Sequence, residues 1–227
     1  MAPLFVLGLL EFARGALVIS LIALYGQFVA GFNLSIIGTA ISLLYLLDNL
    51  FRLPAGWLTD RWGGKWLISV GIVISAFGIL LIYMHWNASF FILGAGLFGL
   101  GVAPVWPAVI SGIAARMPLH HIGEALSKVF IAWLVGAGAG MVVINYLIGY
   151  SYVIAFAILW LVLAIAMLLT VIGNLPRIVP EKISSTSAFL KELSKELISL
   201  RILYPGMFVQ TMSIGLCLLY TSDAADE

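Results

Sequence analysis

The sequence predicts an all-α membrane protein, and three observations support this fold class. Hydrophobic residues make up 63% of the 227 residues and charged residues only 9%, whereas soluble domains have roughly 45–50% and about 25%. The mean hydropathy is +1.16. The apolar residues also fall in stretches of about 20, the length of a helix that crosses a bilayer. This composition excludes a soluble globular enzyme and a disordered chain.

Charge and cysteine content exclude further classes of protein. The net charge of +1 leaves no basic surface for the phosphates of a nucleic acid. A single cysteine, Cys217, excludes an internal disulfide and a cysteine-cluster metal site. We therefore expect a multi-pass membrane protein without a metal ion or other cofactor.

Six complete membrane-spanning helices are expected. They cover residues 3–27, 35–54, 66–85, 89–114, 124–148 and 152–173. Each stretch is apolar on all sides, which excludes an outer-membrane barrel, because barrel strands alternate between apolar and polar residues. Together the six helices form the expected first domain, residues 1–173.

The first stretch is expected to remain in the protein as a helix. A signal peptide has a basic amino-terminal region, an uninterrupted apolar core and a small-residue cleavage site. Residues 1–15 lack the basic region, Glu11 and Arg14 interrupt the apolar stretch, and no cleavage site follows. An uncleaved first span is therefore predicted.

A polar linker, residues 174–203, follows the sixth span. Five apolar residues recur in it at helical spacing, with lysine and glutamate between them: Phe189, Leu190, Leu193, Leu197 and Leu200. This pattern is typical of an amphipathic helix in the membrane interface, and a solvated linker helix fits it equally well.

A seventh span is expected to begin after the linker, at residues 204–216. The chain then turns polar, and its last residues read CLLYTSDAADE. This string resembles the translation of a sequencing adapter, so residues 217–227 are predicted to be a non-native tail and are excluded from fold reasoning.

The basic residues predict the orientation. The turns at 28–34, 86–88 and 149–151 contain no lysine or arginine. The opposite connections contain Arg61, Lys65, Arg116, Arg177, Lys182, Lys191, Lys195 and Arg201, and Arg52 and Lys128 lie just inside spans on the same side. Because cytoplasmic loops carry the excess of lysine and arginine, the amino terminus is predicted to be cytoplasmic.

A ten-residue motif, GWLTDRWGGK, lies between the second and third spans. It resembles the G-x-L-x-D-R-x-G-x-K loop of the major facilitator superfamily, with six matched positions: Gly56, Leu58, Asp60, Arg61, Gly63 and Lys65. Gly56 is expected to allow close approach of helices, and Gly63 with Gly64 to permit a tight turn. Asp60 and Arg61 can pair with each other and with helix-end dipoles. An ordinary positively charged loop is the alternative.

The resemblance implies a fold and a function. The family has two six-helix halves, each made of inverted three-helix repeats. The chain would then be the amino-terminal half of this fold, a linker and part of the seventh helix. The implied function is secondary active transport rather than enzymatic catalysis. The implied partner is a carboxy-terminal half of the same protein, which Asp60 would face.

Shorter strings point to a subfamily. They are LEFARG at 10–15, APVWP at 103–107 and YPG at 204–206, together with Asp48, Gln210, Gly123, Trp133, Gly136 and Asn145. They resemble the glycolipid flippases of the lipoteichoic-acid pathway in Gram-positive bacteria. That resemblance implies a bacterial cytoplasmic membrane, a diglucosyl-diacylglycerol substrate and coupling to protons.

Two alternatives stay open. One is a general small-solute or drug exporter of the same superfamily, although the fifth span has no proline and so lacks the glycine-proline motif of proton-coupled drug antiporters. The other is a non-transporting membrane protein, such as an assembly subunit or an intramembrane enzyme. The sequence shows neither H-E-x-x-H nor a Ser-His-Asp spacing that would support an enzyme.

Several glycines form patterns that resemble binding motifs. Gly94, Gly96 and Gly99 match G-x-G-x-x-G, but they lie inside an apolar span rather than between a strand and a helix. Helix packing by small residues is predicted there and at Gly136 and Gly140. The pair His120-His121 lies in a loop without neighbouring carboxylates, so solvated histidines are predicted.

Three ionisable residues are expected deep in the membrane. At about 1.5 Å per residue, Glu11 lies roughly 12 Å, Arg14 roughly 16 Å and Asp48 roughly 9 Å from the inner ends of their spans. Trp106 is expected in the same layer. A charge at the bilayer centre costs about 2.5–3.5 kcal/mol on insertion scales, so such residues usually face a cavity and pair.

These four residues are the candidate substrate and proton site. Arg14 would hold an anionic or sugar group, Trp106 would stack on a sugar ring, and Asp48 or Glu11 would carry the coupled proton. The alternative is a purely structural ion pair that locks the first two helices together.

Overall fold

The computed structural model describes residues 2–114 and 121–173. This part of the chain is helical and contains six helices long and apolar enough to cross a membrane: Pro3–Phe28, Leu34–Thr59, Gly64–Met84, Ala88–Ile113, Ile122–Ile148 and Tyr152–Ile172. The predicted all-α membrane fold with six spans is confirmed. The predicted linker, seventh helix and tail lie outside the described residues. The helices that the structure describes all belong to one compact unit, Met1–Val179.

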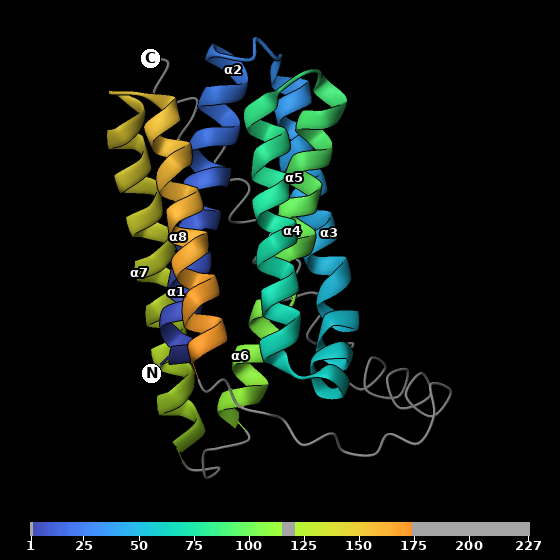
Figure 1. The fold of residues 1–227 in the computed structure, drawn as a ribbon, viewed down its shortest axis with the longest axis vertical. Coiled ribbons are helices and arrows are strands. Elements are labelled where there is room, and N and C mark those ends of the chain that lie inside the picture. The colour runs from blue at the N-terminus through green and yellow to red at the C-terminus, as the bar shows by residue number, and fades with distance from the viewer. Residues whose placement is uncertain (1, 115–120, 174–227) are drawn as a thin grey trace. The chain divides into compact units, whose positions relative to one another are not determined.

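Two groups of three helices make up this unit (Figure 1). One group consists of α1 (Ala2–Gly15), α7 (Ile122–Ile148) and α8 (Tyr152–Ile172). The other consists of α3 (Leu34–Trp62), α4 (Gly64–Met84) and α5 (Ala88–Val102). Helix α1 packs chiefly on α7, and α5 packs on both α3 and α4, while the contact between α4 and α8 joins the two groups.

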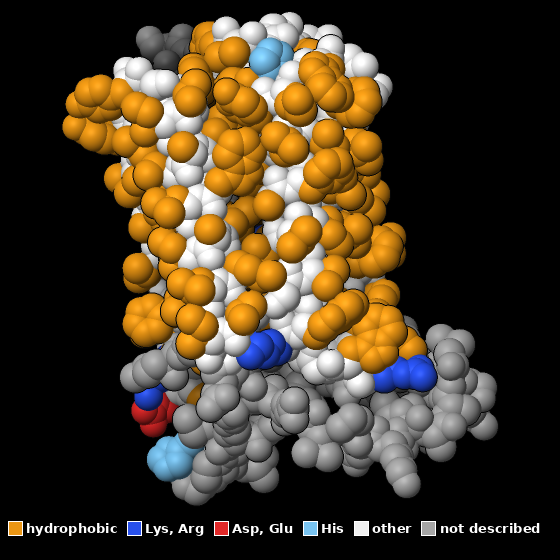
Figure 2. Space-filling model, viewed as in Figure 1, with side chains coloured by type: hydrophobic (Ala, Val, Ile, Leu, Met, Phe, Trp, Pro, Cys, Tyr) orange, Lys and Arg blue, Asp and Glu red, His pale blue; other side chains and the backbone are white. Residues whose placement is uncertain are grey.

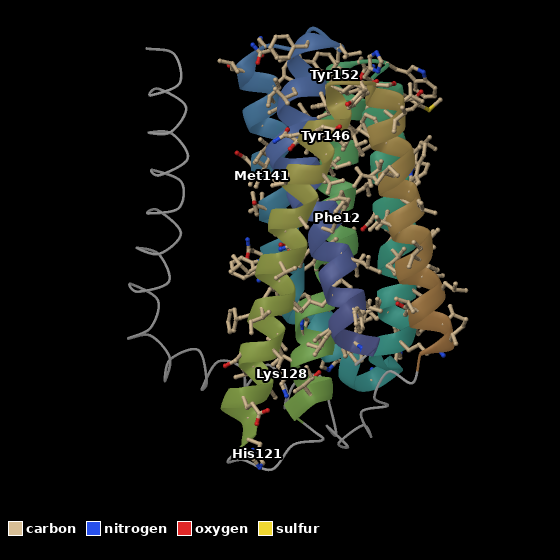
Figure 3. All side chains as sticks on the ribbon, turned by 90° about the vertical axis from the view of Figure 1, so that its left-hand side faces the viewer. Phe12, His121, Lys128, Met141, Tyr146 and Tyr152 are labelled. Atoms are coloured by element: carbon tan, nitrogen blue, oxygen red, sulfur yellow. The ribbon has the colours of Figure 1, made fainter. Side chains whose placement is uncertain are left out.

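Glycines allow the closest of these contacts. A Cβ atom on Gly136 would collide with the Gly8 carbonyl, and one on Gly140 with the Phe12 carbonyl, both on α1. Phe12 lies beside α7 in Figure 3. On α5, a Cβ on Gly99 would collide with the backbone of α3, and one on Gly94 with that of α4. The predicted role of these glycines in helix packing is confirmed.

The first span contains an unexpected change of helix type. Helix α1 ends at Gly15, directly after Arg14, and a π-helix, η1 (Ala16–Tyr25), continues the span to the short helix α2 (Gly26–Phe28). Most residues of η1 are buried. Nothing in the apolar pattern of the sequence indicated this change, and π-helical segments frequently occur at functional sites.

The fourth span is one membrane-length stretch of helix, Ala88–Ile113, as expected, but its α-helical hydrogen bonding has a break at Ala103 and Pro104. Helix α5 ends at Val102, and α6 (Val105–Ala114) begins after a turn at Ala103 and Pro104. Pro104 has no N–H group and therefore cannot continue the hydrogen-bond ladder of α5. The Ala108 N–H bonds the Pro104 carbonyl at 3.1 Å and starts α6. The break places Trp106 in the first turn of α6.

The two ends of the unit differ in side-chain chemistry. In Figure 2 the visible face is hydrophobic along its length, and the lysine and arginine side chains lie at its lower end. Figure 3 shows Lys128 and His121 at that end of α7, with Tyr146 and Tyr152 toward the other end. An apolar band with lysine and arginine gathered at one end is typical of a membrane-spanning protein, and the chain is a multi-pass membrane protein.

Candidate functional site

Four sequence-predicted residues from three helices meet inside the bundle. Glu11 and Arg14 lie one turn apart on α1, Asp48 lies on α3 and Trp106 on α6. An Arg14 guanidinium nitrogen lies 3.6 Å from a Glu11 oxygen and another lies 3.3 Å from an Asp48 oxygen. The Trp106 indole N–H donates to Glu11 Oε1 at 2.8 Å. The structure thus brings together all four candidate residues, as their depths in the spans predicted.

Arg52 is a fifth member that sequence reasoning missed. Its Nη2 lies 2.8 Å from Asp48 Oδ2 and its Nε lies 3.2 Å from Oδ1, which makes a two-pronged contact. Because Arg52 follows Asp48 by four positions on α3, the two side chains share a helix face. That spacing was the available signal; Arg52 was instead assigned only to the basic edge of its span.

The cluster is buried and electrically balanced. Glu11 is 1%, Asp48 0% and Arg14 9% exposed, while the Arg52 side chain is 36% exposed. Two carboxylates and two guanidinium groups give these four side chains no net charge when all are ionised. Buried charges need such pairing because an uncompensated charge in a low-dielectric interior is costly.

Hydrogen bonding in the cluster is incomplete. Among the described residues, Glu11 Oε2 and Arg14 Nε are buried without a hydrogen-bond partner, and Arg14 Nη2 contacts Asp48 Oδ2 only as an ion pair at 3.3 Å. Most buried polar atoms in proteins have a partner, either protein or ordered water. Glu11 Oε2 can therefore take up a proton or accept a hydrogen bond. Arg14 can donate hydrogen bonds to water or to a polar ligand.

Three aromatic rings, which we call the aromatic wall, lie next to the cluster: Trp106, Phe130 and Trp133. The Trp106 ring centroid lies 6.0 Å from that of Phe130 and 6.1 Å from that of Trp133, both on α7. These distances allow edge-to-face or tilted packing between the rings. The hydrogen bond to Glu11 fixes the polar edge of the indole, so Trp106 joins the aromatic wall to the charged cluster.

Helix α3 presents a polar face that leads to the cluster. Its members recur at helical spacing and are exposed or half-buried: Ser35, Thr39, Ser42, Tyr45, Asn49 and Arg52. Thr39 and Asn49 donate side-chain hydrogen bonds to carbonyls one turn back on α3. A polar face this long suits water or protein better than lipid tails, because polar groups are costly in hydrocarbon.

The motif between the second and third spans is mostly helical, where a loop was expected. Helix α3 continues through Pro54 to Trp62, and Gly63 alone separates it from α4. Membrane helices tolerate such a proline because neighbouring groups satisfy the freed carbonyl. Gly63 has φ +90°, a conformation that favours glycine, which confirms its predicted turn role.

Other motif positions differ from expectation in detail. A Cβ on Gly56 would meet Pro107 at an ordinary 3.6 Å, so the expected close approach is not there. It lies instead at Gly64, where a Cβ would come within 3.2 Å of Ala108 on α6. The prediction of close approach at Gly56 was wrong, because the nearest atom to its Cβ position, on Pro107 of α6, lies at an ordinary contact distance. Leu58 is half-buried on α3.

The charged motif residues lie at the basic end of the bundle. The Arg61 guanidinium lies over the Trp57 ring, 5.4 Å from its centroid. Lys65 Nζ donates to the Val171 carbonyl in the last turn of α8. A cation at a helix carboxy terminus is favourable because it complements the dipole, so Lys65 ties the start of α4 to the end of α8. The Asp60 side chain lies outside the described part, and its predicted pairing stays a prediction.

The beginning of α7 carries a separate ion-pair group. Glu124 accepts a hydrogen bond from Lys128 at 2.8 Å and lies 3.6 Å from His121. All three side chains are more than half exposed. Exposed pairs of this kind contribute little to stability. His120, the other histidine of the predicted solvated pair, lies outside the described residues.

Comparisons with known proteins agree with the geometry. A profile of the Major Facilitator Superfamily matches residues 4–223. A relative from Staphylococcus epidermidis, named proton-coupled antiporter flippase LtaA, is 26% identical over 213 residues, covering 93% of this chain and 52% of the relative. Proteins of the same name from Staphylococcus haemolyticus and Staphylococcus saprophyticus are 27% and 30% identical, covering 64% and 63% of this chain and 35% of each relative. The chain thus spans about half the length of the Staphylococcus epidermidis relative.

Proposed function

The chain belongs to the major facilitator superfamily, and we propose that it is the amino-terminal half of a proton-coupled flippase for a glycolipid of the diglucosyl-diacylglycerol type. The relatives named above are proton-coupled antiporter flippases. In an antiporter the proton and the lipid cross the membrane in opposite directions. The chain's own residues then have to bind a sugar headgroup and to exchange a proton.

The observation that carries the proposal is the incompletely satisfied charged cluster. Among the described residues, Glu11 Oε2 and Arg14 Nε are buried without hydrogen-bond partners, and Arg14 Nη2 has only its ion pair with Asp48. A purely structural ion pair gains most when every donor and acceptor is satisfied. Unused hydrogen-bonding capacity at the membrane interior favours a site that exchanges ligands, and intramembrane ionisable residues commonly mark proton relays and substrate pathways.

The residues suit a sugar headgroup. Sugar hydroxyls can accept hydrogen bonds from Arg14 and donate to Glu11. The Trp106 ring offers an apolar face for a sugar ring, with its indole N–H held by Glu11. The polar face of α3 would contact the headgroup on its way across the membrane, while the acyl chains remain in an apolar environment.

A second six-helix half is part of the proposal. The spans of α3 and α7 are the least covered of the six, with 22% and 17% of an 18-residue apolar stretch of each buried. A partner half beside α3 would enclose its polar face together with the cluster. Transporters of this kind place the substrate between two repeats that rock around it. The aligned length, about half of the Staphylococcus epidermidis relative, is consistent with this arrangement.

Orientation and gating complete the proposed mechanism. The basic end with Arg61 and Lys65 would face the cytoplasm of a bacterial cell, with the amino terminus on the same side. Asp60, Arg61 and Lys65 would act on the equilibrium between inward-open and outward-open states. They would not bind substrate, because they lie at the end of the bundle and not at its middle.

The experiment that tests the function uses proteoliposomes containing this chain with its carboxy-terminal half. A fluorescent diglucosyl-diacylglycerol is followed across the bilayer with and without a pH gradient. The expected result is gradient-dependent flipping of the glycolipid and none of diacylglycerol without its sugars. Gradient-driven transport of a cationic dye, with no movement of the glycolipid, would favour the general exporter instead.

A further inference from the structure

The contact of Arg52 with Asp48 has no role yet in the proposed transfer of a proton. It lies one turn from Asp48 on α3, and its fork contacts both carboxylate oxygens. Its side chain is 36% exposed, whereas Asp48 is fully buried. Arg52 therefore connects a buried carboxylate to the exposed polar face of α3.

The two carboxylates of the cluster have unequal surroundings. Asp48 has two cations within 3.3 Å, Arg14 from α1 and Arg52 from its own helix. Within the described part of the chain, Glu11 has only Arg14, at 3.6 Å without a hydrogen bond, and the neutral Trp106 N–H. Charge-assisted, two-pronged arginine contacts are among the strongest hydrogen bonds to a carboxylate, and among the described residues Asp48 has such a contact and Glu11 does not.

We propose that Arg52 is a positioning residue that holds Asp48 as a permanent anion, so that the proton taken up by the cluster goes to Glu11. The inference rests on the proposed proton coupling and narrows it to one carboxyl group. The proton goes to Glu11 Oε2, the carboxylate oxygen without a partner among the described residues. Asp48 then remains the counter-ion of Arg14 and Arg52 throughout the cycle.

The net charge of the cluster depends on its charged and titratable neighbours among the described residues. From α1 they are Glu11 and Arg14, and from α3 they are Asp48, Arg52 and the Tyr45 phenol, which interacts electrostatically with all four. Helix α6 contributes the neutral Trp106. With Glu11 ionised these groups sum to zero, and a proton on Glu11 leaves one positive charge. Loss of Arg52 would restore neutrality in the protonated state and remove the second cation from Asp48.

Infrared spectroscopy tests the inference without any transport assay. The carbonyl stretch of protonated carboxyl groups is recorded as a function of pH for the chain in lipid nanodiscs. The variants are Glu11→Gln, Asp48→Asn, Arg52→Gln and the double variant Arg52→Gln/Asp48→Asn. Exposed carboxyl groups such as Glu124 are common to all samples and cancel in the difference spectra.

The proposal predicts a specific pattern of band losses. Glu11→Gln removes the buried carboxylic acid band, and Asp48→Asn retains it. In Arg52→Gln an additional carbonyl band appears, from protonated Asp48. The double variant Arg52→Gln/Asp48→Asn lacks this additional band. Arg52→Lys, which keeps the charge, should show the parent pattern. Arg52→Met, whose unbranched side chain replaces the aliphatic stem of arginine, serves as a second neutral variant should Arg52→Gln fail to fold.

Two results would overturn the assignment. One is loss of the band in Asp48→Asn and not in Glu11→Gln. The other is a neutral Arg52 variant whose folded form shows no additional band from protonated Asp48 at any pH. The test is independent of substrate: if the glycolipid does not move in proteoliposomes but the band pattern holds, the proposed substrate is wrong while the role of Arg52 stands.

Discussion

The Trp106 indole N–H donates to Glu11 Oε1 at 2.8 Å and connects two residues that lie 95 positions apart in the chain. Trp106 lies in the first turn of α6, directly after Pro104, and Glu11 lies on α1. The hydrogen bond uses one carboxylate oxygen and leaves Oε2 without a partner among the described residues. The contact thus orients the carboxyl group to which we assign the proton.

Removing this hydrogen bond should weaken the cluster. Trp106→Phe keeps an aromatic ring but leaves both Glu11 oxygens without a neutral donor, and an unsatisfied buried group costs about 1–3 kcal/mol. We expect a lower melting temperature in detergent. Trp133→Phe is the matched control because Trp133 belongs to the same aromatic wall and is not among the donors to the cluster. An equal drop in both variants would show that ring packing, and not the hydrogen bond, accounts for the loss.

The glycine contacts between α1 and α7 should be equally specific. Gly140→Ala would force a Cβ against the Phe12 carbonyl, whereas Gly138 has nothing within 4 Å of such an atom. Overpacking typically costs about 1–3 kcal/mol, so Gly140→Ala should unfold at lower temperature and Gly138→Ala should not. Similar melting temperatures for the two variants would contradict the observed close packing of these helices.

Much of the fold could be predicted from the sequence because the membrane imposes a length on each helix. Six apolar stretches gave six spans, and the small residues of α5 and α7 indicated close packing. The break after Val102 and the π-helix at Ala16–Tyr25 could not be predicted by apolar length, since both lie inside continuous apolar stretches. Pro104 was a visible signal, but Pro54 lies within an uninterrupted helix, so proline alone does not decide between a break and a continuous span.

The candidate site was partly predictable for a similar reason. The sequence predicted one common layer in the membrane for four residues, from the position of each along its span. They are Glu11, Arg14, Asp48 and Trp106. Depth does not give pairing, however, and Arg52 was assigned to the basic edge because its long side chain allows its charge to lie a turn away from its backbone. In the folded protein its side chain turns toward Asp48 instead.

The motif at the basic end should affect conformational change more than binding. In the transporter formed with a second half, Asp60→Asn is expected to lower turnover while substrate affinity stays near the parent value, because position 60 lies at the end of α3. Measuring flipping rates over a range of glycolipid concentrations separates the two quantities. A loss of affinity at unchanged turnover would mean that this end of the bundle contacts the substrate.

The chain alone should insert into a membrane without transporting. Its six spans are complete, but the proposed substrate site lies between two halves. Labelling of single introduced cysteines in the turns would establish insertion, and a liposome flipping assay would measure activity. Coupled flipping by the isolated chain would contradict the requirement for a second half, unless cross-linking shows that two copies assemble.

The most direct test of proton coupling through Glu11 compares two carboxyl groups of the same six-helix unit in proton-driven flipping. Glu11→Gln removes the buried carboxyl of the cluster, and Glu124→Gln removes an exposed carboxyl that pairs with Lys128. Both variants are reconstituted with the second half, and the flipping of diglucosyl-diacylglycerol is measured with and without a pH gradient. The account predicts that Glu11→Gln loses the acceleration by the gradient and that Glu124→Gln keeps it. Gradient-dependent flipping by the Glu11→Gln variant at the parent rate would contradict the account.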